Sequence, residues 1–135
     1  ISNCLEHFKM LPMYLGRNFD NEHFTQDFQT QLMDGQTTDK LMATYIKNGI
    51  YDGRAVQTFI NKFFSMKASN NKRFDYGPYF KALSKLDPQL YYNLDSFWEG
   101  WVNFKIGNPP EEYQNILETF LNEMGTWIKN KTLIY

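Results

Sequence analysis

The clearest pattern of apolar and polar positions in the chain runs from Asp87 to Ile128. It contains two stretches in which apolar residues recur at intervals of three and four, the spacing that places one apolar stripe on a helix. A Gly107-Asn108-Pro109-Pro110 sequence between them predicts a tight turn. The pattern therefore predicts a long antiparallel helical hairpin. Its apolar positions are Leu90, Leu94, Phe97, Trp98, Trp101 and Val102 in the first stretch and Tyr113, Ile116, Leu117, Phe120, Leu121, Met124, Trp127 and Ile128 in the second.

The same spacing predicts three shorter helices at the beginning of the chain. They are expected over residues 3–15, 20–33 and 37–49. Gly35 should close the second helix and Gly49 the third, because glycine commonly follows the last turn of a helix. The residues expected to cap their amino ends are Asn3, then Asp20 or Asn21, then Thr37 or Thr38.

A fourth helix is expected from Asp52 to about Lys67, where the apolar spacing is strong. Pro78 suits the first turn of a fifth helix. Asp87 is expected to cap the sixth helix, with Pro88 in its first turn. The apolar positions of the fourth helix are Val56, Phe59, Ile60, Phe63 and Phe64.

No segment alternates apolar and polar residues over a useful length, so no β-sheet is expected. The pairs Asn48-Gly49 and Asp52-Gly53 are typical of turns, but they are expected here between helices. The sequence thus predicts an all-α fold, a single domain over residues 1–135 with six to seven helices that close with the hairpin. Six residues central to their apolar arcs are expected in the core: Phe63, Leu94, Phe97, Trp101, Leu117 and Phe120.

Composition limits the classes of partner and compartment. A chain of 135 residues fits one sizeable core, and its formal charge of −1 gives no general attraction to nucleic acid or acidic membranes. A single cysteine, Cys4, fits a reducing compartment, so a cytoplasmic location is expected. A chain that starts at Ile1 is expected to be either the C-terminal part of a longer polypeptide or a chain whose start has been trimmed.

The sequence offers little for catalysis or metal binding. His7 and His23 lie on different predicted helices, and neither has a carboxylate or cysteine at a metal-ligand spacing. Cys4 and His7 are one helical turn apart, but no glycine-rich turn or oxyanion donor accompanies them. No phosphate-binding glycine motif occurs. We therefore expect no enzyme activity, no metal and no cofactor.

A basic stretch raises the question of nucleic-acid binding. Positive charges with neighbouring aromatic rings are able to contact phosphates and stack on a base. A solvated loop explains the same residues and is the favoured interpretation, so no direct nucleic-acid contact is expected. The stretch comprises Lys62, Lys67, Lys72 and Arg73, followed by Phe74 and Tyr76.

Aromatic residues make up 18% of the chain and are densest in the fourth and sixth predicted helices. A pocket walled by large rings, with tyrosine and tryptophan tips for orientation, suits a flat apolar ligand. An ordinary aromatic core is the simpler alternative. Gly100 and Gly125 interrupt the last two helices and would allow a close approach. The residues expected to bind an apolar or aromatic small molecule are Phe59, Phe63, Tyr91, Trp98 and Trp101.

A bundle of six or seven helices that closes with a long hairpin is similar to the ligand-binding regions of bacterial one-component transcriptional regulators. In many of these the last two helices pair across a dimer axis. The resemblance implies an effector-binding domain that dimerises through the C-terminal hairpin. The apolar stripe of the last helix, which is wider than one neighbour can cover, supports the homodimer independently.

The alternative function is a helical protein–protein interaction module, such as an immunity, inhibitor or adaptor protein, with no small-molecule ligand. The ligand-sensing domain and the interaction module predict different surroundings for the aromatic residues. An internal apolar cavity would favour the sensor. A packed core with an exposed apolar patch would favour the interaction module.

Overall fold

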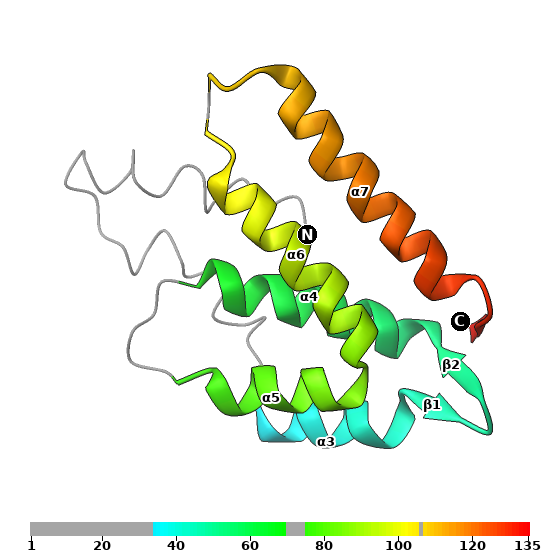
Figure 1. The fold of residues 1–135 in the computed structure, drawn as a ribbon. Helices are drawn as coiled ribbons and strands as arrows, with labels where there is room; N and C mark the ends of the chain where they lie inside the picture. The colour runs from blue at the N-terminus through cyan, green and yellow to red at the C-terminus, as the bar shows by residue number, and fades with distance from the viewer. Residues whose placement is uncertain (1–33, 70–74, 106) are drawn as a thin grey trace.

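A computed structural model describes residues 34–69, 75–105 and 107–135, and in these it is predominantly helical, as expected (Figure 1). The helices expected over 3–15 and 20–33 lie outside these residues. Five helices are described: α3 (Gly35–Thr44), α4 (Gly53–Ala68), α5 (Gly77–Leu86), α6 (Pro88–Asn103) and α7 (Pro110–Ile128). Three short strands accompany them: β1 (Ile46–Lys47), β2 (Ile50–Asp52) and β3 (Thr132–Ile134).

Carboxylate caps begin three of the helices. The side chain of Asp52 accepts hydrogen bonds from the backbone N–H groups of Arg54 and Ala55, which satisfies the open amino end of α4. Asp87 does the same for α6, as predicted. At α3 the cap is Asp34 rather than a threonine, since its carboxylate accepts the N–H of residue 37 at 2.6 Å. The helix therefore begins at Gly35, which the sequence had suggested as the end of the preceding helix.

The expectation of no β-sheet is wrong, and so is the extension of α3 to Gly49. Asn48 and Gly49 have φ values of 54° and 78°, and positive values at both positions define the tight turn that suits an antiparallel hairpin. This turn joins β1 to β2, with Lys47 paired to Ile50. The strands have only two and three residues, so alternation has no length over which to show. The Asn48-Gly49 pair was the local signal in the sequence for this hairpin.

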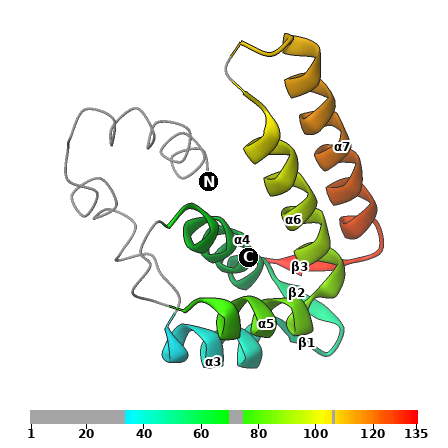
Figure 2. The same cartoon turned by 60° about the vertical axis from the view of Figure 1, so that its left-hand side comes forward.

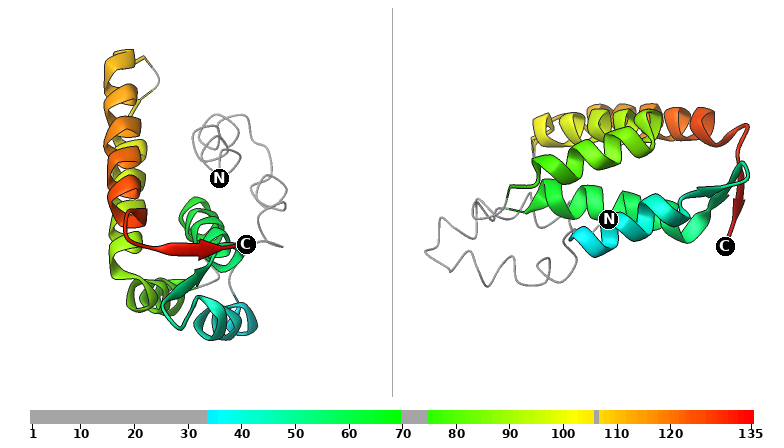
Figure 3. Two further views of the ribbon diagram at one scale, coloured as in Figure 1. Left: turned by 90° about the vertical axis from the view of Figure 1, so that its right-hand side faces the viewer. Right: turned by 90° about the horizontal axis from the view of Figure 1, so that it is seen from below.

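The third strand comes from the far end of the chain. After α7 the backbone returns to β2 and pairs with it in parallel, which places Leu133 opposite Tyr51 (Figure 3). The ring of Tyr135 then lies over the first residue of α4: a Cβ on Gly53 would be only 2.7 Å from the Tyr135 Cζ atom. A larger residue at position 53 would therefore force the Tyr135 ring to shift.

The core surrounds α4. This helix is packed between α3, α5, α6 and the sheet, and nine of its 16 residues are buried (Figure 2). Of the six predicted core residues, Phe63, Leu94 and Phe97 are buried as expected. The other three are half-buried against the same core, namely Trp101, Leu117 and Phe120.

The predicted helical hairpin is formed by α6 and α7, which run antiparallel, with α7 alongside α6 at the edge of the molecule (Figures 1 and 2). Gly100 lies at their contact, where a Cβ would be 3.4 Å from the Ile116 side chain, an ordinary van der Waals distance. No helix within the described ranges has the length and apolarity needed to cross a membrane.

Candidate interaction surface

The five residues predicted to bind a small molecule lie at or beside the interface of α4 and α6. Phe59 and Phe63 have no exposed surface, and Trp98 is also buried. Tyr91 and Trp101 are half-buried. Each residue therefore lies in or against the aromatic core.

Ring contacts fill the region around these residues. Phe63 meets the Tyr91 ring edge to face, with centroids 5.4 Å apart. Phe59 packs on a neighbouring tyrosine, and Trp98 on a neighbouring phenylalanine, at 5.7 and 6.4 Å. Trp101 stacks on Phe97 at 6.4 Å. Edge-to-face and tilted arrangements at these distances are the favourable geometries for aromatic side chains within a core.

The cavities found among the described residues lie elsewhere. One is a groove of about 240 Å³ between α6 and α7, lined by residues that include Ser96, Gly100 and Thr119. The other, of about 570 Å³, is an open depression between the end of α3 and the sheet, lined in part by Ile50 and Tyr135. Neither is lined by the five predicted ligand residues. Small-molecule binding between α4 and α6 stays a prediction.

The basic stretch is partly engaged within the protein. The Lys67 ammonium group lies 2.7 Å from the Asp95 carboxylate on α6 and over the rings of Phe63 and Phe80. Burial of the Lys62 ammonium group disfavours its charged form and so lowers its pKa. The remaining two basic residues of the stretch, positions 72 and 73, lie outside the described residues. Lys67 thus joins α4 to α6 rather than extending into solvent.

A buried carboxylate anchors the end of α7. Asp87 accepts hydrogen bonds from the Tyr45 hydroxyl at 2.8 Å, from the Trp127 indole N–H at 3.0 Å and from the Leu90 backbone N–H at 2.9 Å. Burial, followed by the nearby Asp87 charge, raises the pKa of the Tyr45 hydroxyl. The sequence had indicated only the capping role of Asp87. Its partners are distant along the chain, so no local pattern reveals them.

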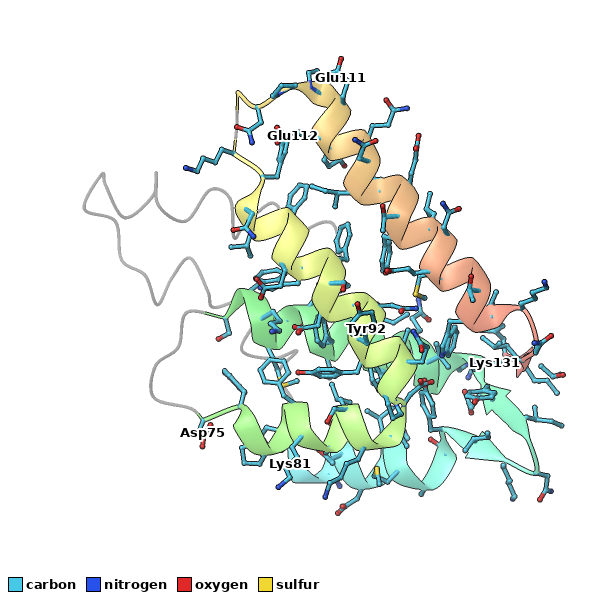
Figure 4. All side chains as sticks on the ribbon, viewed as in Figure 1. Asp75, Lys81, Tyr92, Glu111, Glu112 and Lys131 are labelled. Carbon is cyan, nitrogen blue, oxygen red and sulfur yellow. The ribbon has the colours of Figure 1, made fainter. Side chains whose placement is uncertain are left out.

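A cation completes this anchor. Lys131 donates from Nζ to the backbone carbonyl of Trp127 at 2.5 Å and lies over the rings of Trp127 and Tyr51 (Figure 4). The carbonyl belongs to the last turn of α7, where the helix dipole favours a positive charge. Together these contacts fix the carboxyl end of α7 and the start of β3.

The rest of α7 is held along one side. Tyr113 contacts the Trp101 ring, and Phe120 contacts the Phe97 ring with centroids 4.5 Å apart. Asn93 on α6 donates to the backbone carbonyl of Glu123. Among all nineteen residues of α7, each of them described, only Trp127 is buried. Contact with α6 therefore leaves a large part of the helix uncovered.

The apolar residues of α7 that remain exposed or half-exposed form one stripe, which we call the outer flank. Two of its members, Leu117 and Met124, are half-buried and also pack against the core. Leu121 is 65% exposed and Ile128 is 46% exposed. Beside them a Cβ on Gly125 would meet nothing within 4 Å. The spacings of three and four residues place all members on one side of the helix. The outer flank comprises Leu117, Leu121, Met124, Gly125 and Ile128.

Opposite charges mark the two ends of α7. Glu111 and Glu112 lie in its first turn, and Lys129 and Lys131 follow its last turn (Figure 4). Glu111, Glu112 and Lys129 are exposed. This distribution stabilises the helix through its dipole. It also makes one end of the surface negative and the other end positive, which favours one orientation of a partner.

Comparison with protein-family models, with curated proteins and with solved structures gives no match for this chain. The assignment of a function therefore depends on the geometry of the outer flank, the packed aromatic core and the charges of α7.

Proposed function

We propose that this chain is a helical protein-interaction module that forms a homodimer through the outer flank of α7. The observation that carries the proposal is the exposure of Leu121, in the middle of a long amphipathic helix. An apolar stripe of this kind on a surface is typical of an interaction site. The cytoplasmic location expected from the single cysteine belongs to the same proposal.

A second copy of the chain is the occupant best matched to this surface. A twofold dimer pairs the same patch on both subunits, so the patch has to complement itself. An apolar stripe satisfies this requirement in its centre. At the ends, antiparallel pairing brings the acidic start of one α7, at Glu111, near the basic end of its mate, at Lys129.

The size of the stripe sets the expected affinity. Full burial of a leucine or isoleucine side chain contributes about 1.5–3 kcal/mol, whereas association costs roughly 4–15 kcal/mol. The exposed parts of Leu121 and Ile128 on two chains reach only the lower end of that cost. A dimer therefore also needs the half-exposed Leu117 and Met124 and the charge pairs at the ends of α7, and its affinity should be no better than micromolar. Its formation should be sought at about 100 μM, where a micromolar dissociation constant gives mostly dimer.

Sedimentation equilibrium tests the proposal. The wild-type chain should have twice the 16.1 kDa mass of the monomer, and Leu121→Asp should have the monomer mass because it buries a charge at the interface. Tyr92→Asp is the matched control. Tyr92 is 62% exposed on α6, close to the exposure of Leu121, and its substitution should leave the dimer intact.

A wild-type monomer at about 100 μM would overturn the proposal. One further result would assign the flank differently. A monomer in which Leu121→Asp lowers the unfolding free energy by more than about 1 kcal/mol would mean that Leu121 is packed within its own chain and not against a second copy.

The ligand-sensing domain of a transcriptional regulator is the other function expected from the sequence. A ligand-sensing domain would also form the homodimer, but it requires in addition a cavity between α4 and α6. A melting screen with flat apolar compounds tests for this cavity. A compound that binds should add about 2.7 kcal/mol to the unfolding free energy at a hundredfold excess over its Kd. Trp98→Ala should abolish that gain. The absence of any stabilising compound would leave the interaction module as the better proposal.

A further inference from the structure

We infer that the two α7 helices pair antiparallel about a twofold axis near Leu121, with Leu117 of each chain seated against Gly125 of the other. The inference rests on the proposed homodimer and adds its register. Three observations carry it: the unexplained glycine, the spacing of the outer flank and the placement of charge along α7.

The glycine is the first observation. Glycine destabilises the interior of a helix relative to alanine, so a mid-helix glycine calls for a packing reason. Gly100 lies against another helix of the same chain, because a Cβ there would be in contact with the Ile116 side chain at 3.4 Å. Gly125 has no such neighbour among the described residues, since its Cβ would meet open space. A second chain that approaches closely at this position supplies the reason.

The spacing of the flank gives the register. Leu117 precedes Leu121 by four residues, and Gly125 follows it by four. A twofold axis at Leu121 therefore brings the side chain of Leu117 opposite the open position at Gly125, twice in each dimer. This alternation of a large and a small residue lets two helices approach closely.

The charges select the antiparallel direction. With the axis at Leu121, Glu111 lies within two residues of the level of the mate's Lys129, about 3 Å along the helix axis. Both side chains are exposed in the single chain. Parallel pairing would place each Glu111 beside its own copy, and like charges at an interface oppose association.

Disulfide formation between single-cysteine chains tests the register. In a Cys4→Ser background, Leu117→Cys chains and Gly125→Cys chains are mixed and oxidised. In the mixed dimer one Leu117–Gly125 contact is unchanged. At the other contact the two cysteines face each other within the distance a disulfide needs. We expect efficient cross-linking in the mixture and little in either variant alone, because the two copies of position 117 are separated by about 12 Å of helix.

Gly125→Leu tests the seat in a second way. The added side chain points into open space in the single chain, so the monomer should keep its helical circular dichroism and melt no lower than wild type. In the dimer the added side chain meets Leu117 of the mate, and overpacking of this kind should raise the dissociation constant by at least about tenfold. Asn115→Leu, at an exposed position of α7 outside the outer flank, is the control that should leave the dissociation constant unchanged.

The outcomes separate this inference from the proposed function. Cross-linking of each variant with itself would show a parallel dimer and overturn the register while the dimer stands. A dimer that gives no cross-link in any sample would also overturn the register alone. An unchanged dissociation constant in Gly125→Leu would have the same meaning. A wild-type chain that stays monomeric overturns both.

Discussion

Helices α4 and α7 carry apolar residues at the same helical spacing, yet the protein uses them differently. Nine of the 16 residues of α4 are buried, whereas one of the 19 residues of α7 is. The difference lies in the neighbours: α4 has other elements around it, and α7 has α6 along one side. A periodic stripe therefore identifies the side of a helix that needs cover, but not what covers it.

The largest effect should follow removal of a ring from the centre of α4. Phe63 has no exposed surface and contacts four other aromatic or cationic side chains, so Phe63→Ala should lower the unfolding free energy by about 3–5 kcal/mol. The same change at half-buried Phe120 on α7 should cost less, roughly 1–3 kcal/mol. Urea denaturation of the two variants measures this contrast, and equal losses would contradict it.

An intermediate effect is expected at the anchor of α7. Trp127→Phe keeps an aromatic ring but removes the N–H that Asp87 accepts, and a hydrogen bond to a charged group contributes about 1.5–3 kcal/mol. Thermal melting should show this loss even in a monomeric Leu121→Asp background. A loss no greater than that of an exposed substitution would show that the indole contributes packing alone.

The smallest effect should come from the outer flank within a single chain. Below the dissociation constant of the dimer, Leu121→Asp should change the unfolding free energy by no more than about 0.5 kcal/mol, as is usual for exposed positions. Denaturation at low micromolar concentration compares the variant with wild type. A large loss in dilute solution would place Leu121 in the core of the monomer and remove the contrast with α4.

Local signals in the sequence accounted for much of the helical fold. The Asp87 cap and the Pro78 turn predicted the starts of α6 and α5 because each signal acts within one helical turn. The apolar spacing after Asp52 predicted the start of α4. The β1–β2 hairpin was missed because its strands are too short to alternate and the Asn48-Gly49 pair was assigned to a turn between helices. The third strand was missed because it pairs residues far apart in the chain, Tyr51 with Leu133. No local pattern reports such a contact.

The candidate surface was predicted less completely. The sequence indicated an apolar excess on the last helix, and the structure identifies Leu121 and Ile128 as the exposed part of it. It also favoured a ligand site around Trp98, which lies in packed aromatic surroundings. Whether a set of rings encloses a cavity or fills a core depends on side-chain packing, which periodicity does not encode.

The parallel pairing of β2 with β3 has a consequence for the order in which the chain assembles. Contacts between distant residues close long loops, and their entropic cost delays them during folding. Helices α3 to α6 have most of their partners nearby in the chain, so the α4 core is able to form without the last strand. Leu133 then joins Tyr51 as a late step. In pulsed hydrogen exchange during refolding, amides of α4 should gain protection before those of β3 do.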